Sequence, residues 1–150
     1  MKKVIISLIL MLFVLTGCKN KEEFFLTYNN KDIKLDTVYK DSEYNDFFES
    51  ENCAFGEKDI TYIYDDIEIE TYGNKNNELI IYSIRLINDS VKTNEGIGLY
   101  DNVSLMIDKY GDDYVKEDNK YTYNHGKTSL IFITDNDIIE SIEYALNNLK

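Results

Sequence analysis

The stretch DITYIYDDIEIETYGNKNNELIIYSIRLI, residues 59–87, decides the fold. Apolar and polar residues alternate through Asp59–Tyr64, Ile67–Tyr72 and Leu79–Ile87, and a period of two is typical of half-buried β-strands. Asp65-Asp66 and residues 73–77 supply the Asp, Asn and Gly that favour turns. The stretch therefore predicts three consecutive antiparallel strands, a meander.

The second of these strands predicts a polar face. Ile67, Ile69 and Thr71 are expected toward the core, because successive side chains of a strand point to opposite faces. The alternate positions then face solvent, and tyrosine beside carboxylates suits a basic protein or peptide partner. The predicted binding residues are Tyr72, Glu68 and Glu70. The alternative is that the many tyrosines reflect only an AT-rich coding bias.

For the first and third strands the alternation also predicts which face of the sheet the apolar side chains occupy. Tyr62 and Tyr64 share the parity of Ile60, so we expect both rings in the core. The third strand is expected to bring four apolar side chains together on one face, namely Ile80, Tyr82, Ile84 and Leu86.

The second half of the chain repeats the pattern, with strands expected at Lys120–Asn124, Thr128–Ile133 and Ile138–Tyr144. A short helix is predicted before each meander. One covers Asp101–Tyr110, where apolar residues recur at helical spacing and Gly111 is a natural C-terminal stop. The other, weaker helix covers Ser42–Glu49. The predicted fold class is α+β: two tandem repeats, each a short helix plus an antiparallel meander, with the helices packed on one sheet face.

Three pairs of matching segments indicate a tandem duplication, although chance matching in a chain rich in Tyr and Ile is the alternative. The pairs are Phe55-Gly56 with Tyr110-Gly111, 62–64 with 121–123, and 81–84 with 139–142. The predicted organisation is a signal peptide (1–17), a tether (18–23), a first repeat (24–87), a connector (88–95) and a second repeat (96–150).

The N-terminus, MKKVIISLILMLFVLTGC, is typical of a secretory signal. Lys2 and Lys3 precede an apolar run that is too short for a membrane span, which needs about 20 residues. Leu15-Thr16-Gly17-Cys18 resembles the lipobox of bacterial lipoproteins. That resemblance implies a lipid on the Cys18 thiol and a location at the extracytoplasmic face of a bacterial cell membrane. The alternative is a plain signal peptide cleaved elsewhere.

The composition excludes several classes of function. The chain has 150 residues, 16 Lys and Arg against 28 Asp and Glu, and a net charge of −12. This argues against nucleic-acid binding, which needs a surplus of basic side chains, and disfavours lying flat on an anionic membrane. Removal of residues 1–17 takes away Lys2 and Lys3, so the mature domain becomes still more acidic.

The second half also resembles a known repeat. Gly96-Ile97-Gly98-Leu99-Tyr100-Asp101 leads to Tyr110-Gly111, and Ser141-Ile142-Glu143-Tyr144 closes the meander. This is similar to the repeat of BamE/SmpA-type lipoproteins and β-lactamase inhibitory protein, although Tyr100 stands where a glycine is usual. The resemblance implies a fold and a role in protein binding or assembly, and it transfers no active site.

The sequence offers little for catalysis or metal binding. His125 lies in a predicted turn, and Cys53, the one thiol besides Cys18, has no catalytic signature around it. The acidic clusters at 65–68 and 135–140 lack the spacing of a calcium loop and coincide with turns. We therefore expect no enzyme, cofactor or metal, and favour a non-enzymatic protein- or peptide-binding module. The alternatives are a structural or assembly component of the envelope and, last, a small hydrolase.

Overall fold

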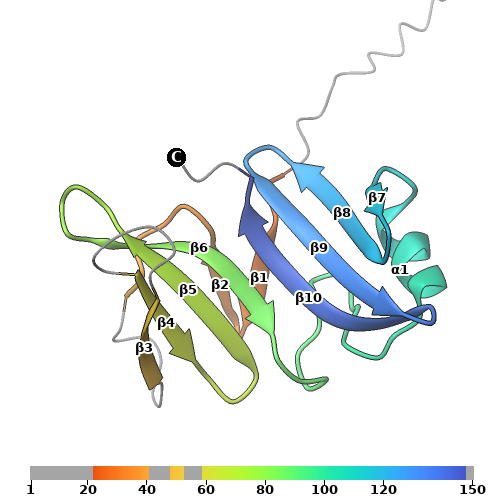
Figure 1. Ribbon diagram of the computed structural model, residues 1–150, viewed down its shortest axis with the longest axis horizontal. Coiled ribbons are helices and arrows are strands. Elements are labelled where there is room, and N and C mark those ends of the chain that lie inside the picture. The colour runs from red at the N-terminus through yellow and green to blue at the C-terminus, as the bar shows by residue number, and fades with distance from the viewer. Residues whose placement is uncertain (1–21, 41–47, 53–58, 148–150) are drawn as a thin grey trace, which may run out of the picture.

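An eight-stranded antiparallel sheet dominates the computed structural model, which describes residues 22–40, 48–52 and 59–147 (Figure 1). A two-stranded hairpin and one helix of eight residues accompany it in the described part of the chain. The elements are β1 (Phe25–Tyr28), β2 (Lys31–Lys34), β3 (Phe48–Asn52), β4 (Asp59–Ile63), β5 (Ile67–Gly73), β6 (Leu79–Leu86), α1 (Val103–Tyr110), β7 (Val115–Glu117), β8 (Lys120–His125), β9 (Thr128–Asp135) and β10 (Ile138–Leu146).

The sheet consists of two meanders that meet at their last strands. Its order is β3-β4-β5-β6-β10-β9-β8-β7, so the strands of the first half mirror those of the second. The join is short, because β6 and β10 pair from Leu86 opposite Ile142 to Ser83 opposite Ala145. The strands expected in both meanders are confirmed within two residues at each end.

The α+β expectation of one helix per repeat is wrong, because the fold is mostly β. The helix expected at 101–110 is present as α1. The one expected at Ser42–Glu49 lies outside the described residues as far as 47, and Phe48 and Glu49 begin β3 instead. Pairing of Phe48 with Ile63 extends the sheet by one strand and satisfies backbone groups that a helix of two turns would leave half unpaired.

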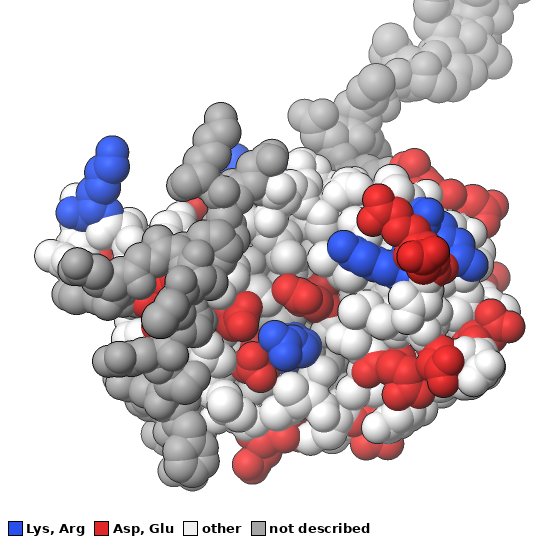
Figure 2. Space-filling view, in the orientation of Figure 1, with Lys and Arg blue, Asp and Glu red and all other residues white. Residues whose placement is uncertain are grey.

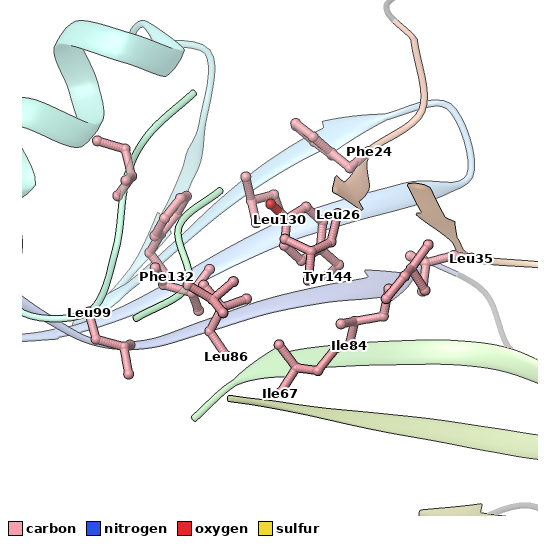
Figure 3. Packing of buried hydrophobic residues seen from close by; sticks show 14 of the residues in the cluster. Phe24, Leu26, Leu35, Ile67, Ile84, Leu86, Leu99, Leu130, Phe132 and Tyr144 are labelled. Atoms are coloured by element: carbon pink, nitrogen blue, oxygen red, sulfur yellow. The ribbon is translucent and has the colours of Figure 1, made fainter. Parts of the chain in front are cut away.

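The core lies against one face of the large sheet. The β1–β2 hairpin, α1 and residues 91–99 pack there, and Leu26 of the hairpin, Met106 of α1 and Ile97 of the connecting loop are fully buried. Figure 3 shows Leu26 of the hairpin beside Leu130 and Tyr144 of the sheet. The two core tyrosines expected from β4 and its turn, Tyr62 and Tyr64, are buried as predicted. The sheet contributes Ile67, Ile69, Ile84, Leu86, Tyr121, Tyr123, Leu130, Phe132, Ile142 and Tyr144 to this core.

A β-bulge in β6 changes which face of the sheet the residues on one side of it point to. Glu70 pairs with Ser83, whereas the next residue of β5, Thr71, pairs with Ile81, so Tyr82 is an extra residue on β6. Ile84 and Leu86 therefore stay on the core face, while Tyr82 contacts the Glu70 carboxylate on the opposite face. The expectation of four apolar side chains on one face is wrong for this reason.

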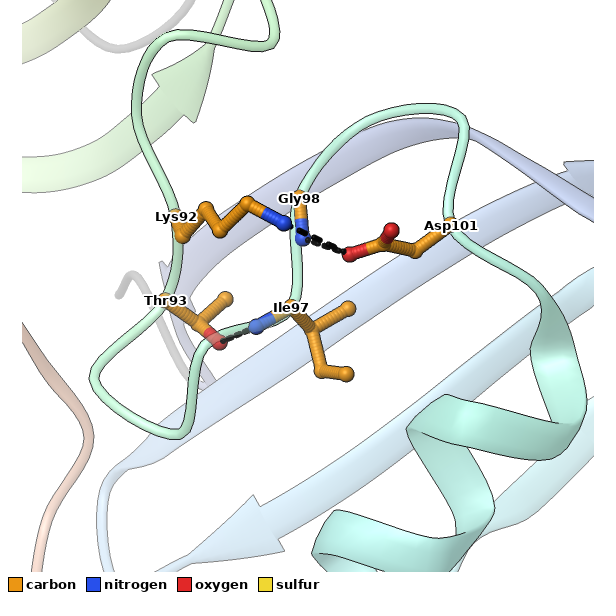
Figure 4. Close-up of polar contacts among 5 residues, drawn as sticks. All are labelled: Lys92, Thr93, Ile97, Gly98 and Asp101. Atoms are coloured by element: carbon orange, nitrogen blue, oxygen red, sulfur yellow. Dashed lines mark hydrogen bonds and ion pairs between the residues drawn. The ribbon is translucent and has the colours of Figure 1, made fainter.

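The connector between the halves is held by side chains that bond to the backbone (Figure 4). Thr93 Oγ1 accepts a hydrogen bond from Ile97 N at 3.0 Å, and Asp101 Oδ2 accepts one from Gly98 N at 2.8 Å. Asn94 binds the edge of β1 by accepting from Thr27 N at 2.9 Å and donating to the Phe25 carbonyl at 3.1 Å. These bonds fix the hairpin over the core.

Candidate functional site

One cross-strand row runs across the sheet on the face opposite the core. Its members lie directly opposite one another on seven adjacent strands. In each of these strand pairs the two paired residues point to the same face of the sheet. We call it the acidic row, and its members are Ile63, Glu68, Arg85, Glu143, Ile131, Thr122 and Val115. The ionised side chains Glu68, Arg85 and Glu143 occupy its centre. The side chains on either side of this centre are uncharged, and all of them except Thr122 are apolar. Ile63 and Val115 are among the exposed large apolar side chains of the described chain.

The centre of the acidic row has more negative than positive charge. Arg85 Nη2 lies 3.3 Å from Glu68 Oε1 and 3.6 Å from Glu70 Oε1, so one guanidinium serves two carboxylates. Glu143, directly opposite Arg85 on β10, accepts a hydrogen bond from Ser83 Oγ at 2.9 Å. Figure 2 shows basic colour enclosed by acidic colour near the middle of this face. Three carboxylates beside one arginine leave a local charge of −2.

The surroundings of Glu70 disfavour the ionised form of its carboxyl group. Burial raises its pKa above the ordinary value, and the neighbouring charges of Glu68 and Glu143 act in the same direction. Arg85 and a hydrogen bond from Tyr82 oppose the shift without cancelling it. A further cation above the sheet would stabilise the ionised form, because an opposite charge favours the charged state of an acid.

Glu68 and Glu70 are thus brought together, and Tyr72 lies on the same strand and face. All three predicted binding residues are partly exposed, and the Tyr72 ring lies near that of Tyr82, 6.2 Å between centroids. Arg85 organises the cluster and is not among the binding residues predicted from the sequence. The sequence did contain a sign that Arg85 lies on the outer face. Arg85 is the single arginine of the chain, and it alternates with the apolar residues Ile84 and Leu86 along the strand.

His125 packs against the beginning of the described chain. Its ring stacks on Phe24 with centroids 4.0 Å apart, and its Nδ1 donates to the Glu22 carbonyl at 3.1 Å. This contact gives the imidazole a structural role. Cys53, its partner in the hydrolase alternative, and the lipobox cysteine Cys18 both lie outside the described residues.

The acidic turns have structural partners of their own. Asp66 Oδ1 accepts hydrogen bonds from Ser90 at 2.6 Å and Asn88 at 2.7 Å, and these bonds lower the pKa of its carboxyl. Within the described ranges no three His, Cys, Asp or Glu side chains gather as a metal site requires.

One hollow among the described residues lies at another part of the molecule, away from the acidic row. It has a volume of about 380 Å³ and is lined by residues 22–25 of the first described segment and 34–37 after β2. The acidic row is instead a broad sheet surface, which suits an extended partner better than a small molecule.

Comparison with known proteins gives no relative for this chain. No family model matches it, and neither a curated protein nor a solved structure matches it. The resemblance to the BamE/SmpA-type repeat therefore stays a prediction. In the part of the chain that the structure describes, no helix is long and apolar enough to cross a membrane.

Proposed function

We propose that this chain is a non-enzymatic binding module for a basic protein or peptide, and that the acidic row is its contact surface. The observation that carries the proposal is the uncompensated pair of negative charges around Arg85. A partner cation placed there is attracted by three carboxylates. Its charge also favours the ionised form of Glu70, which burial disfavours in the free protein.

The two apolar side chains that flank the charged centre of the acidic row set the length of the partner. Ile63 and Ile131 stand on either side of the charged centre, four strand spacings apart. Adjacent strands are about 4.8 Å apart, so the two side chains lie about 19 Å apart. An extended peptide of about six residues covers this distance. The expected ligand therefore has basic side chains between two apolar ones.

Fluorescence anisotropy with synthetic peptides tests this design. The probe is an extended heptapeptide with leucine at both ends and arginine at the centre, and its comparison peptide has glutamate at the centre. We expect the arginine peptide to bind and the Glu70→Gln/Glu143→Gln double variant to bind it about tenfold more weakly, as loss of charged contacts to an interface commonly does.

A matched control separates the acidic row from the overall negative charge. Asp108→Asn/Asp112→Asn removes the same number of carboxylates from exposed positions in and after α1. This variant is expected to bind the arginine peptide as the wild type does. Equal weakening in both double variants would show that only net charge matters, and the proposed contact surface would be wrong.

We further propose that Cys18 is the lipid attachment point and that the domain lies at the extracytoplasmic face of a bacterial membrane. The support is the charged, apolar and small-residue order of residues 1–18. Two or more acyl chains anchor a protein stably, at about 0.8 kcal/mol per buried CH₂. Intact-mass measurement on protein extracted from membranes tests this: an acylated mature chain is expected, and an unmodified mass contradicts the anchor.

A further inference from the structure

The described chain begins on the β8–β9 hairpin. Phe24 N donates to Thr128 Oγ1 at 2.7 Å, and the Phe24 ring stacks on His125 across the turn. Lys127 N donates to the Glu23 carboxylate at 3.4 Å. Backbone, ring and carboxylate contacts therefore fix residues 22–24 to this one end of the sheet.

The proposed anchor lies close to that end in covalent terms. Three residues, 19–21, separate Cys18 from Glu22, so four Cα–Cα steps join the two. Even a fully extended chain spans at most about 14 Å over four such steps. A lipid on Cys18 therefore keeps Glu22, whose carbonyl contacts His125 at the end of β8, within about 14 Å of the lipid-bearing cysteine, whatever path residues 19–21 take.

The two ends of the sheet differ in charge. The three far turns, β4–β5, β7–β8 and β9–β10, together with the residues that follow β6, lie opposite the β8–β9 turn because the strands are antiparallel. Residues 64–66, 87–91, 118–119 and 136–137 contain no lysine or arginine, and red side chains lie along the lower edge in Figure 2. Their acidic residues are Asp65, Asp66, Asp89, Asp118 and Asp137, whereas the lysines next to them are Lys120 at the start of β8 and Lys31 at the start of β2.

Lysines accompany the acids of the near end. The acids at the chain start, after β2, at the start of β4, before β6 and before β7 are Glu22, Glu23, Asp36, Asp59, Glu78, Asp112 and Asp113. The lysines are Lys34, Lys40, Lys75 and Lys127. Lys127 also pairs with Asp36 at 3.0 Å. These lysines offer cations to an anionic lipid surface at the end of the sheet where residues 22–24 lie.

We infer that the near end of the sheet faces the lipid bilayer and that the strands stand away from the membrane surface, with the aspartate-rich turns outermost. This orientation rests on the proposed anchor at Cys18. It points the acidic row sideways, parallel to the bilayer plane, where a partner reaches it without passing between domain and lipid. The turn of β8–β9 and residues 22–24 form the surface next to the lipid.

Quenching of fluorophores by nitroxide-headgroup lipids tests the orientation. The acylated mature chain, which begins at Cys18 and carries Cys53→Ser, is placed in phosphatidylcholine/phosphatidylglycerol vesicles and labelled at one new cysteine. Glu78→Cys reports the near end, and Asp89→Cys, which also removes one carboxylate, reports the far end. Lys127→Cys and Asp135→Cys give a second pair. If Cys53→Ser unfolds the chain, benzoylphenylalanine at the same positions, cross-linked to lipid by light, gives the same comparison.

Several-fold stronger quenching or cross-linking at the near end is expected for both pairs. Equal signals at the two ends, on protein that floats with the vesicles, overturn the orientation and leave the anchor standing. A mass without acyl chains, on protein that does not float, overturns the anchor and the orientation together.

Discussion

Tyr100 provides the sharpest test of the backbone geometry. It has φ +67°, and it is the one residue other than Asn, Asp or Gly with positive φ among those described. An L-residue in the left-handed region costs about 1–2 kcal/mol relative to the right-handed one. Glycine escapes this cost but loses about 0.5–1 kcal/mol more conformational entropy on folding. At position 100, glycine is therefore expected to be more stabilising than alanine by about 0.5–1 kcal/mol.

The comparison of Tyr100→Gly with Tyr100→Ala isolates this backbone effect, because both variants lose the same ring. Tyr100 as a whole residue is 61% exposed, so either loss of its ring changes the core little. Urea unfolding of the mature chain, followed by far-UV circular dichroism, gives both free energies of unfolding. We expect Tyr100→Gly to unfold at the higher urea concentration.

Leu105 supplies the control, because it is a partly exposed residue within α1. There the order reverses, and Leu105→Gly is expected to be about 1 kcal/mol less stable than Leu105→Ala. The reasoning is refuted if Tyr100→Ala equals or exceeds Tyr100→Gly in stability, since no left-handed cost would then exist at position 100.

Three further outcomes follow from contacts of the connector, the helix end and the acidic turn. Asn94→Ala removes two hydrogen bonds to β1 and should lower the free energy of unfolding by about 1–2 kcal/mol. Amide hydrogen exchange in β1 should become faster, and unchanged exchange there would contradict the prediction. Gly111 has φ +80° and ψ −170°, a backbone region essentially restricted to glycine, so Gly111→Ala should lower the free energy of unfolding by about 1–3 kcal/mol in thermal melts, and an unchanged Tm would contradict this backbone requirement. The pKa of Asp66 is lowered in the folded chain, so its ionised form stabilises the fold above the ordinary value of 3.8 and that contribution is lost as pH falls through the folded pKa. Urea midpoints at pH 7 and pH 3 should therefore differ less in Asp66→Asn than in the wild type, and equal differences would rule out this linkage.

The strands were predictable because their side-chain pattern has one clear period. Ile67, Ile69 and Thr71 are buried and alternate with partly exposed residues, as a strand with one covered face requires. The same reasoning located Glu68 and Glu70 on the outer face. It failed at Tyr82, because nothing in the local pattern marks the bulge that turns this residue over.

Long-range pairing accounts for the remaining misses. Arg85 and Glu143 become neighbours only because β6 pairs with β10, and no pattern within either half specifies that pairing. The segment at Ser42–Glu49 has too few residues for its apolar spacing to decide between a helix and a strand. Tyr100 was noted as an unusual residue where a glycine is common, and its positive φ gives that departure a physical meaning.

The short seam between β6 and β10 has a consequence for how the chain could be divided. Glu68, Glu70 and Arg85 come from the first half, whereas Glu143 and Ile131 come from the second. Neither half alone possesses the full contact surface that we propose, so that surface exists only while the two halves are joined. Two separately expressed fragments cut in the connector would regain peptide binding only on reassembly, and a peptide seated across the seam would in turn hold the fragments together.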